Sequence, residues 1–424
     1  MTQSALIPPY KEVIVIGDGL AGLLAAHALN DFFRRVYVIG QSHPVNDGPP
    51  IILHGPEQAE MEALFPGLLA ELVTAGAVRF NLGLHMAWFV SGRWRPRYRS
   101  ALESVACSPA LLAERIHRRL AGYPAIHFLP EEEIVGLDGD PRLTRVTGVR
   151  LHESAALAAD LVVDASGQVD RARGWLRQLA ERPATAHTPL LIEAGCLYQR
   201  PDHLQGSWRA LVIQPAADQS RRGAVILPLE GGRLHLSLLG TAEDAPPLSE
   251  TGFLTFARSL PTPHVGEIMA RAVPLSPIRL LTGNSCSPCA APLTGTERFI
   301  LLPEPERVPY PVLSQAVYYE LQSQAALSET LALSLPYGLD GLPGRWSRQV
   351  AERLRPACML ARAEAQHWAG FVEMDGAAMS HYMGKVVAAS LHSARVLEAL
   401  YAVQQMLEPP AILFRPDIVL QVVL

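Results

Sequence analysis

Residues 13–29 read VIVIGDGLAGLLAAHAL and indicate the fold of the N-terminal part of the chain. It consists of four apolar residues, a turn that contains Gly17, Gly19 and Gly22, and an apolar run with the period of a helix. In such a turn the first glycine permits the tight bend, the second lets the backbone approach a pyrophosphate, and the third lets the helix pack closely on the strand. Since VYVIG at 36–40 has the pattern of a second strand, residues 12–40 predict a strand–helix–strand unit of the dinucleotide-binding type.

The composition indicates a large globular chain. With 424 residues, 49% of them hydrophobic, it can bury an extensive core in two or more domains. A net charge of −5 gives no basis for nucleic-acid binding, and no apolar stretch reaches the length of about 18 residues that a membrane span needs. The five cysteines form no disulfide framework and the first ten residues lack a signal-peptide pattern, so we expect a cytoplasmic protein.

The pattern of apolar residues changes twice along the chain. Successive strands with turn signals fill residues 187–275, and helical periodicity begins near residue 315. We therefore expect an α/β fold with three parts: a Rossmann-like domain with a parallel sheet from 1–80, 100–185 and 276–335, a mixed or antiparallel sheet domain that binds substrate from 81–99 and 186–275, and a C-terminal helical region from 336–424.

A second motif narrows the family. LVVDASGQVDRARGWL at 161–176 resembles the strand and turn of FAD-dependent monooxygenases of the aromatic-hydroxylase type, and FPGLLAELVTAGAV at 65–78, GAVILPLEGGRLHLSLLG at 223–240 and SPIR at 276–279 are similar in the same order. The match is best to the subgroup found in natural-product biosynthesis and covers most of the chain. It implies an FAD-binding fold in which the turn after Asp164 closes over the dinucleotide.

The flavin-handling positions depart from this family. There the second strand ends in an acid that binds the adenosine ribose, whereas here it ends Val38-Ile39-Gly40-Gln41, so that Gln41 offers only a weaker hydrogen bond. The family also has an arginine near the start of a following helix, and Pro109 takes its place. Two contacts that the resemblance implies for FAD are therefore replaced.

The largest departure lies in FILLPEPERVPYPVLSQAV at 299–317. Pro303-Glu304-Pro305 replaces a Gly-Asp-Ala element, and only Pro311 and Gln315 are kept from the Asn-Pro-x-x-Gly-Gln-Gly block. Glu304 keeps a carboxylate one methylene further from the backbone, while the prolines remove N–H donors. We therefore expect no cofactor, and a vestigial or weak FAD site at Gly17, Gly19, Gly22, Gln41, Asp164 and Glu304 in which the three glycines serve packing more than phosphate binding.

Three functions stay open. The first is a cofactor-independent cyclase that folds a large apolar, polyketide-like intermediate in a deep pocket and closes a ring without redox chemistry. The second is an FAD-dependent monooxygenase that uses NAD(P)H and oxygen. The third is a non-catalytic scaffold that binds a partner enzyme. If the protein is an enzyme of either kind, we expect its partner to be a bulky, apolar small-molecule substrate.

Five side chains are candidates for catalysis, and none suggests a metal site. Glu193 and Tyr198 lie on the strand LLIEAGCLYQ, His235 lies on RLHLSLLG, Tyr310 lies in the altered loop and His54 lies in ILHG. A carboxylate such as Glu193 in an apolar strand needs a partner or a raised pKa. The alternatives are that Glu193 and His235 face solvent, that Tyr310 only packs, and that His54 does not line the site.

Overall fold

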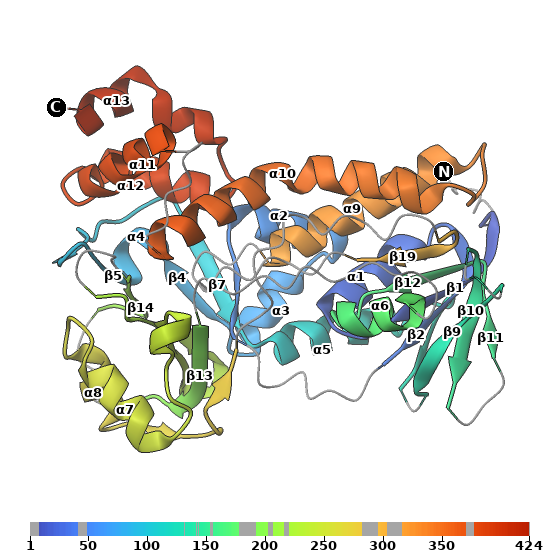
Figure 1. Ribbon diagram of the computed structural model, residues 1–424, viewed down its shortest axis with the longest axis horizontal. Coiled ribbons are helices and arrows are strands. Elements are labelled where there is room, and N and C mark those ends of the chain that lie inside the picture. Colours follow the sequence, from blue (N-terminus) through green and yellow to red (C-terminus); the bar gives the residue numbers. More distant parts are fainter. Residues whose placement is uncertain are drawn as a thin grey trace.

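The computed structural model describes residues 8–40, 49–130, 132–140, 142, 144–152, 156–177, 192–201, 207–215, 220–281, 296–302, 316–369 and 377–423 (Figure 1). Two large sheets lie at opposite ends of the molecule, and C-terminal helices cover one side (Figure 1). The predicted α/β class, with a parallel sheet, a mixed sheet and C-terminal helices, is confirmed.

The first sheet is parallel and has the strand order β19-β12-β1-β2-β8. Alternation along its central strand sorts side chains onto two faces: Val13 and Val15 pack against helices, while Ile14 and Ile16 pack on the opposite side. The strands are β1 Tyr10–Ile16, β2 Phe33–Ile39, β8 Ile126–Leu129, β12 Leu161–Asp164 and β19 Phe299–Leu301.

Helices cover one face of this sheet and a small antiparallel sheet covers the other. On the helical face Leu23 and Leu24 belong to the same fully buried cluster as Val13 and Val15. The helices of this layer are α1 Leu20–Leu29, α5 Pro109–Leu120, α9 Ala316–Ser334 and the first part of α10 Leu342–Ala369. The opposite layer consists of β9 Ile134–Gly139, β10 Val146–Leu151, β11 Leu157–Ala158 and α6 Val169–Arg177.

The second sheet is mixed and has the order β17-β13-β16-β15-β14-β5-β6, with β18 also paired to β13. Among the described strands of this sheet, β14 and β5 pair in parallel and the other pairs are antiparallel. Two short helices cover one face with Phe253, Phe256 and Val265. The elements are β5 Met86–Val90, β6 Arg93–Trp94, β13 Ile192–Gln199, β14 Ala210–Ile213, β15 Gly223–Leu229, β16 Arg233–Gly240, β17 Val273–Pro274, β18 Arg279–Leu280, α7 Glu250–Arg258 and α8 His264–Met269.

Another three-stranded sheet contributes residues to the cores of both halves. It consists of β3 Ile51–Leu53, β7 Glu103–Cys107 and β4 Val78–Asn81, with α4 Leu82–His85 leading into β5. Pro66 and Gly67 separate two helices, α2 Gly55–Leu64 and α3 Leu68–Thr74, and Gly67 has φ +83°.

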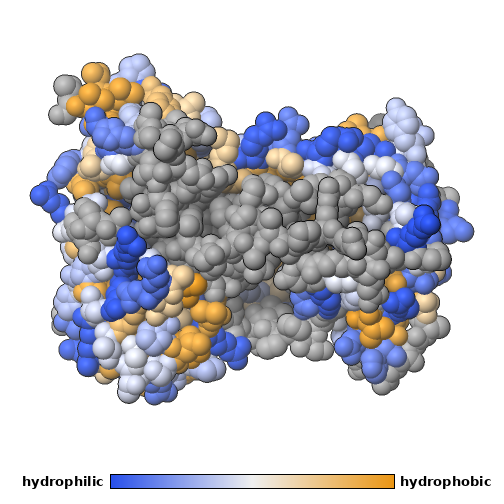
Figure 2. Space-filling model, in the orientation of Figure 1, coloured by the Kyte–Doolittle hydropathy of each residue, from blue (hydrophilic) through white to orange (hydrophobic). Residues whose placement is uncertain are grey.

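The C-terminal helices pack on the second sheet through a cluster that includes Trp88, Leu397 and Tyr401. Two separate helices follow residue 377, because Ser393 accepts a hydrogen bond from the Val396 N–H at 3.2 Å and starts a new helix. The helices are α11 Ala377–Ala389, α12 Ala394–Gln404 and α13 Pro416–Val423. Figure 2 shows apolar side chains gathered at the position of α13, where Leu420 and Val423 are exposed.

Among the described helices, none combines the length and apolar character needed to cross a bilayer.

Cys107 and Cys196 are free and buried, whereas Cys358 on α10 takes part in a disulfide bond, which the cysteine pattern does not predict.

Candidate functional site

The glycine turn lies at the carboxyl ends of β1 and β2. Gly17 adopts φ +105°, a left-handed conformation that favours glycine, and its N–H donates to the Ile39 carbonyl at 2.9 Å. Gly19 then forms the N-cap of α1. The first free N–H groups of α1 therefore face outward beside the sheet edge, the arrangement that binds phosphates at a helix N-terminus.

The three glycines have different roles. A Cβ on Gly22 would lie 2.0 Å from the Gly17 carbonyl oxygen, so that only glycine lets α1 approach the turn. A Cβ on Gly17 would lie 3.0 Å from the Ala165 oxygen, whereas a Cβ on Gly19 would meet no atom of the described residues within 4 Å. Gly17 and Gly22 are therefore positions of close backbone packing, and Gly19 is not. The expectation that the three glycines serve packing more than phosphate binding stays a prediction.

Asp164 shapes the turn that lies against Gly17. It is fully buried at the end of β12, paired with Ile16 of β1. Its Oδ1 accepts hydrogen bonds from the Ser166 N–H at 2.9 Å and the Ser166 hydroxyl at 2.6 Å, whereas Oδ2 has no hydrogen-bond partner among the described residues. Burial raises the pKa of the carboxyl, and the Ser166 bonds oppose this. Through these two hydrogen bonds, Asp164 fixes the conformation of the DASG turn, residues 164–167.

On the second sheet, the register separates the candidate residues. His235 pairs with Leu197, and Glu193 pairs with Leu239, which places His235 and Glu193 on one face. Tyr198 lies on the other face, in the cluster beneath α7 and α8. Glu193 is 7% exposed and His235 5% exposed, so the alternative that either faces solvent is wrong. Tyr198 is not brought together with these two residues.

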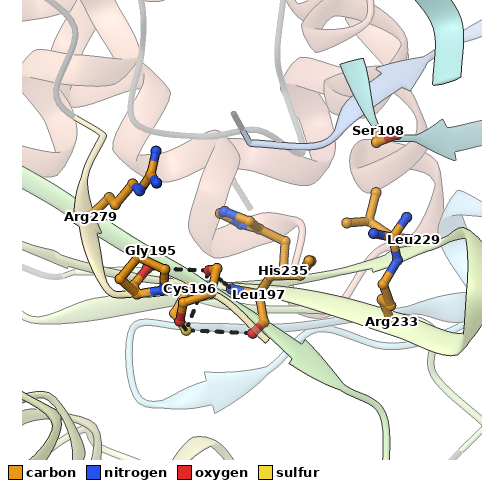
Figure 3. A pocket seen from close by; sticks show the side chains of 10 residues that line it. Ser108, Gly195, Cys196, Leu197, Leu229, Arg233, His235 and Arg279 are labelled. Atoms are coloured by element: carbon orange, nitrogen blue, oxygen red, sulfur yellow. Dashed lines mark hydrogen bonds between the residues drawn. The ribbon is translucent and has the colours of Figure 1, made fainter. Parts of the chain in front are cut away.

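His235 borders a small recess on this face (Figure 3). Its Nδ1 lies 3.4 Å from the Ser237 hydroxyl, and a Cβ on Gly195 would lie 2.8 Å from its Cε1, so that Gly195 makes room for the ring. Burial lowers the pKa of the imidazole to about 4. At neutral pH the ring is uncharged. It can then donate one hydrogen bond and accept another, but it does not carry a second proton and a positive charge.

The recess is narrow, and both charged and apolar residues line it. Arg233 is held at one side by the Glu230 carboxylate at 2.6 Å, and the same carboxylate accepts a hydrogen bond from the Ser108 N–H at 3.1 Å. With a volume of about 20 Å³, the recess holds a group the size of one water molecule. The deep apolar pocket stays a prediction. The lining residues are Ser108, Gly195, Cys196, Leu197, Leu229, Arg233, His235, Ser276, Pro277 and Arg279.

Solved structures share this architecture. pqsL, a probable FAD-dependent monooxygenase from Pseudomonas aeruginosa, matches 87% of this chain and 99% of its own with a TM-score of 0.64 at 17% identity. The p-nitrophenol 4-monooxygenase PnpA from Pseudomonas putida DLL-E4 matches 94% of this chain and 99% of its own with a TM-score of 0.65 at 16% identity. The chain has the fold of FAD-dependent monooxygenases. The predicted resemblance is thus confirmed at the level of the fold.

Sequence similarity to known proteins is weaker. No family model matches the chain. Protein Rv3254 of Mycobacterium tuberculosis is 27% identical over 293 residues, which span 63% of this chain and 61% of Rv3254. The match therefore covers less than two thirds of that relative's length.

In the monooxygenase fold, the described residues fit the diphosphate part of FAD. The backbone at Gly19 is unobstructed, Gly22 keeps α1 close to the turn, and the DASG turn lies against Gly17. Pro109, which replaces the family's arginine, is the first residue of α5, and Ser108 caps that helix by accepting from the Leu111 N–H at 3.1 Å. The substitution thus removes a cation but provides a well-formed helix start.

The remaining cofactor and site residues predicted from the sequence cannot be placed with these. Gln41, Glu304 and Tyr310 lie outside the described residues. The expectation of a protein without flavin depends on the segments that contain them, and it stays a prediction.

His54 lies apart from the His235 recess and has a buried acidic neighbour that sequence reasoning missed. It is the N-cap of α2, and its Nδ1 lies 2.9 Å from the Ser104 hydroxyl. Glu57, one turn further along α2, is 2% exposed, and burial raises the pKa of its carboxyl to about 8. Its position four residues before the fully buried Met61 was the available signal, because that spacing places both on one helical face.

Proposed function

We propose that the protein is an FAD-dependent monooxygenase that acts on an apolar small molecule carrying a hydroxyl or carbonyl group. The observation that carries this proposal is the glycine turn: Gly22 is in contact with the Gly17 carbonyl, and the backbone at Gly19 is unobstructed in front of α1. A glycine at this position lets the backbone come close to a pyrophosphate. When bound, the flavin would supply electrons from NAD(P)H for the activation of oxygen.

The chain's own residues would bind and orient the two reactants. The N–H groups at the start of α1 would bind the diphosphate, and Ser166 and Asp164 would hold the turn that closes beside it. The His235 recess would take the polar group of the substrate, because a neutral imidazole can hydrogen-bond a hydroxyl and the recess admits only one small group. The apolar remainder of the substrate would lie outside this recess.

A cofactor-independent cyclase is the second candidate. It is supported by the sequence changes at Gly40, Pro109 and Pro303-Glu304-Pro305, which replace several family contacts to FAD at once. On this reading the substrate would be a large, polyketide-like intermediate whose reacting ends are brought together by the shape of the site.

An absorbance spectrum tests the choice directly. The purified protein, incubated with FAD and freed of excess by gel filtration, is expected to keep a flavin spectrum between about 350 and 500 nm. Gly19→Ala is the matched control, because the added methyl meets no protein atom and would stand where the diphosphate approaches. A wild-type protein that keeps no FAD, and behaves like Gly19→Ala, would refute the monooxygenase and favour the cyclase.

A further inference from the structure

The end of β2 has an unusual neighbour. Gly40 is the first residue after β2, and the hydrogen bond from the Gly17 N–H to the Ile39 carbonyl brings it beside the glycine turn. A Cβ on Gly40 would lie 2.8 Å from Oδ2 and 3.2 Å from Cγ of Asp18. The Asp18 carboxylate therefore occupies the space in which a side chain at position 40 would begin.

The position of the Asp18 carboxylate matters because a dinucleotide-binding sheet usually has an acid near this place. The acid that binds the ribose hydroxyls normally comes from the carboxyl end of the second strand, about 20 residues beyond the glycine turn. Here that end carries Gly40, without a side chain, and a carboxylate reaches the same place from inside the turn. A larger side chain at position 40 would displace the Asp18 carboxylate from this place.

We propose that Asp18 binds the ribose hydroxyls of the adenosine half of FAD, in place of the acid missing at position 40. This inference rests on the proposed function, since it assumes that the chain binds the dinucleotide. Asp18 is half-buried, and across the described residues the structure gives its carboxylate no hydrogen bond or ion pair. Both oxygens thus keep their capacity to accept hydrogen bonds from a vicinal diol.

A structural role makes the opposite prediction. An acid close to the N-terminus of α1 interacts favourably with the helix dipole whether or not a ligand binds. It would also repel a diphosphate that approaches the same helix end. If this were the only role of Asp18, its removal would strengthen binding of the dinucleotide. The sign of the effect on affinity therefore separates the two roles.

The test uses ADP and 2′-deoxy-ADP as probes in isothermal titration calorimetry, with FAD in parallel. The wild-type protein is expected to prefer ADP over 2′-deoxy-ADP by about tenfold or more, the worth of a hydrogen bond to a charged group. Asp18→Ala should weaken ADP binding by a similar factor and abolish the preference. The double variant Asp18→Ala with Gly40→Glu should regain both, because it moves the carboxylate back to the strand.

Each other outcome is decisive. Unchanged or tighter ADP binding by Asp18→Ala, with unchanged thermal unfolding, would overturn the assignment while leaving FAD binding intact. Equal binding of ADP and 2′-deoxy-ADP by the wild type would overturn it without recourse to a variant. A wild-type protein that binds neither FAD nor ADP would refute the proposed function itself, and this inference with it.

Discussion

The carboxyl of Glu57 is expected to make the protein less stable as the pH rises, and Glu57→Gln should remove that dependence. The side chain is 2% exposed, and within the described part of the chain its Oε2 has no hydrogen-bond partner. The backbone N–H groups of His54 and Glu57 oppose the effect of burial only in part. Because burial raises the pKa from 4.5 to about 8, the folded protein holds a proton that the unfolded chain releases. The stability from this group is full below 4.5 and is lost as the pH rises through about 8.

The size of the effect follows from these two pKa values. Each unit of pKa difference corresponds to about 1.4 kcal/mol, so that burial of Glu57 costs about 1 kcal/mol at about pH 5 and about 4 kcal/mol at about pH 8. Glutamine has nearly the same shape, accepts the same backbone hydrogen bonds and never ionises. The free energy of unfolding of Glu57→Gln, relative to wild type, should therefore rise by about 3 kcal/mol between these two pH values.

Urea unfolding followed by tryptophan fluorescence, repeated across this pH range for both proteins, measures the difference. Glu352→Gln serves as the control for the loss of one carboxylate, since Glu352 is an exposed residue of α10. Glu57→Gln and wild-type curves that stay parallel from about pH 5 to about pH 8 would show that Glu57 ionises freely in the folded protein. The buried environment assigned to the start of α2 would then be wrong.

Two further predictions concern the glycine turn and the second sheet. Gly22→Ala should destabilise the protein by about 1–3 kcal/mol or more, because its methyl would lie 2.0 Å from the Gly17 oxygen. Gly19→Ala, in contrast, should unfold at the wild-type temperature. If thermal unfolding showed equal losses of stability for the two variants, the geometry of the turn would be wrong. For His235, whose pKa is lowered from 6.5 to about 4, wild-type stability should fall by about 3 kcal/mol relative to His235→Gln as the pH drops through this window. Chemical unfolding at about pH 7 and about pH 4 measures this, and a constant difference would exclude a buried neutral imidazole.

Most of the fold could be predicted from local sequence patterns. The strand, glycine turn and helix at 13–29 are a contiguous signal, and the break at Pro66-Gly67 follows from backbone chemistry alone. The separation of Glu193 from Tyr198 was also present in the sequence, because residues five apart on a strand face opposite sides of the sheet.

Other features of the site depend on tertiary contacts. His235 becomes buried beside Gly195 only through the pairing of β13 with β16, two strands whose register no local pattern specifies. In the same way, the sequence alone shows at Gly40 only the loss of the acid that would contact the adenosine ribose. Only the fold brings Asp18 to the same place, because the two residues meet at the adjoining ends of β1 and β2.

The position of β19 at the edge of the parallel sheet has a consequence for synthesis of the chain on the ribosome. β1, β2, β8 and β12 have all been translated by Asp164. The strand that pairs with the other side of β12, away from β1, is Phe299–Leu301, which follows the entire second sheet. During that interval the nascent sheet carries an open parallel edge of apolar residues, Leu161–Val163, whose unpaired backbone groups can pair with a neighbouring chain. Expression fragments that end before Phe299 keep this edge exposed permanently, so they should form aggregates even when every earlier element has folded.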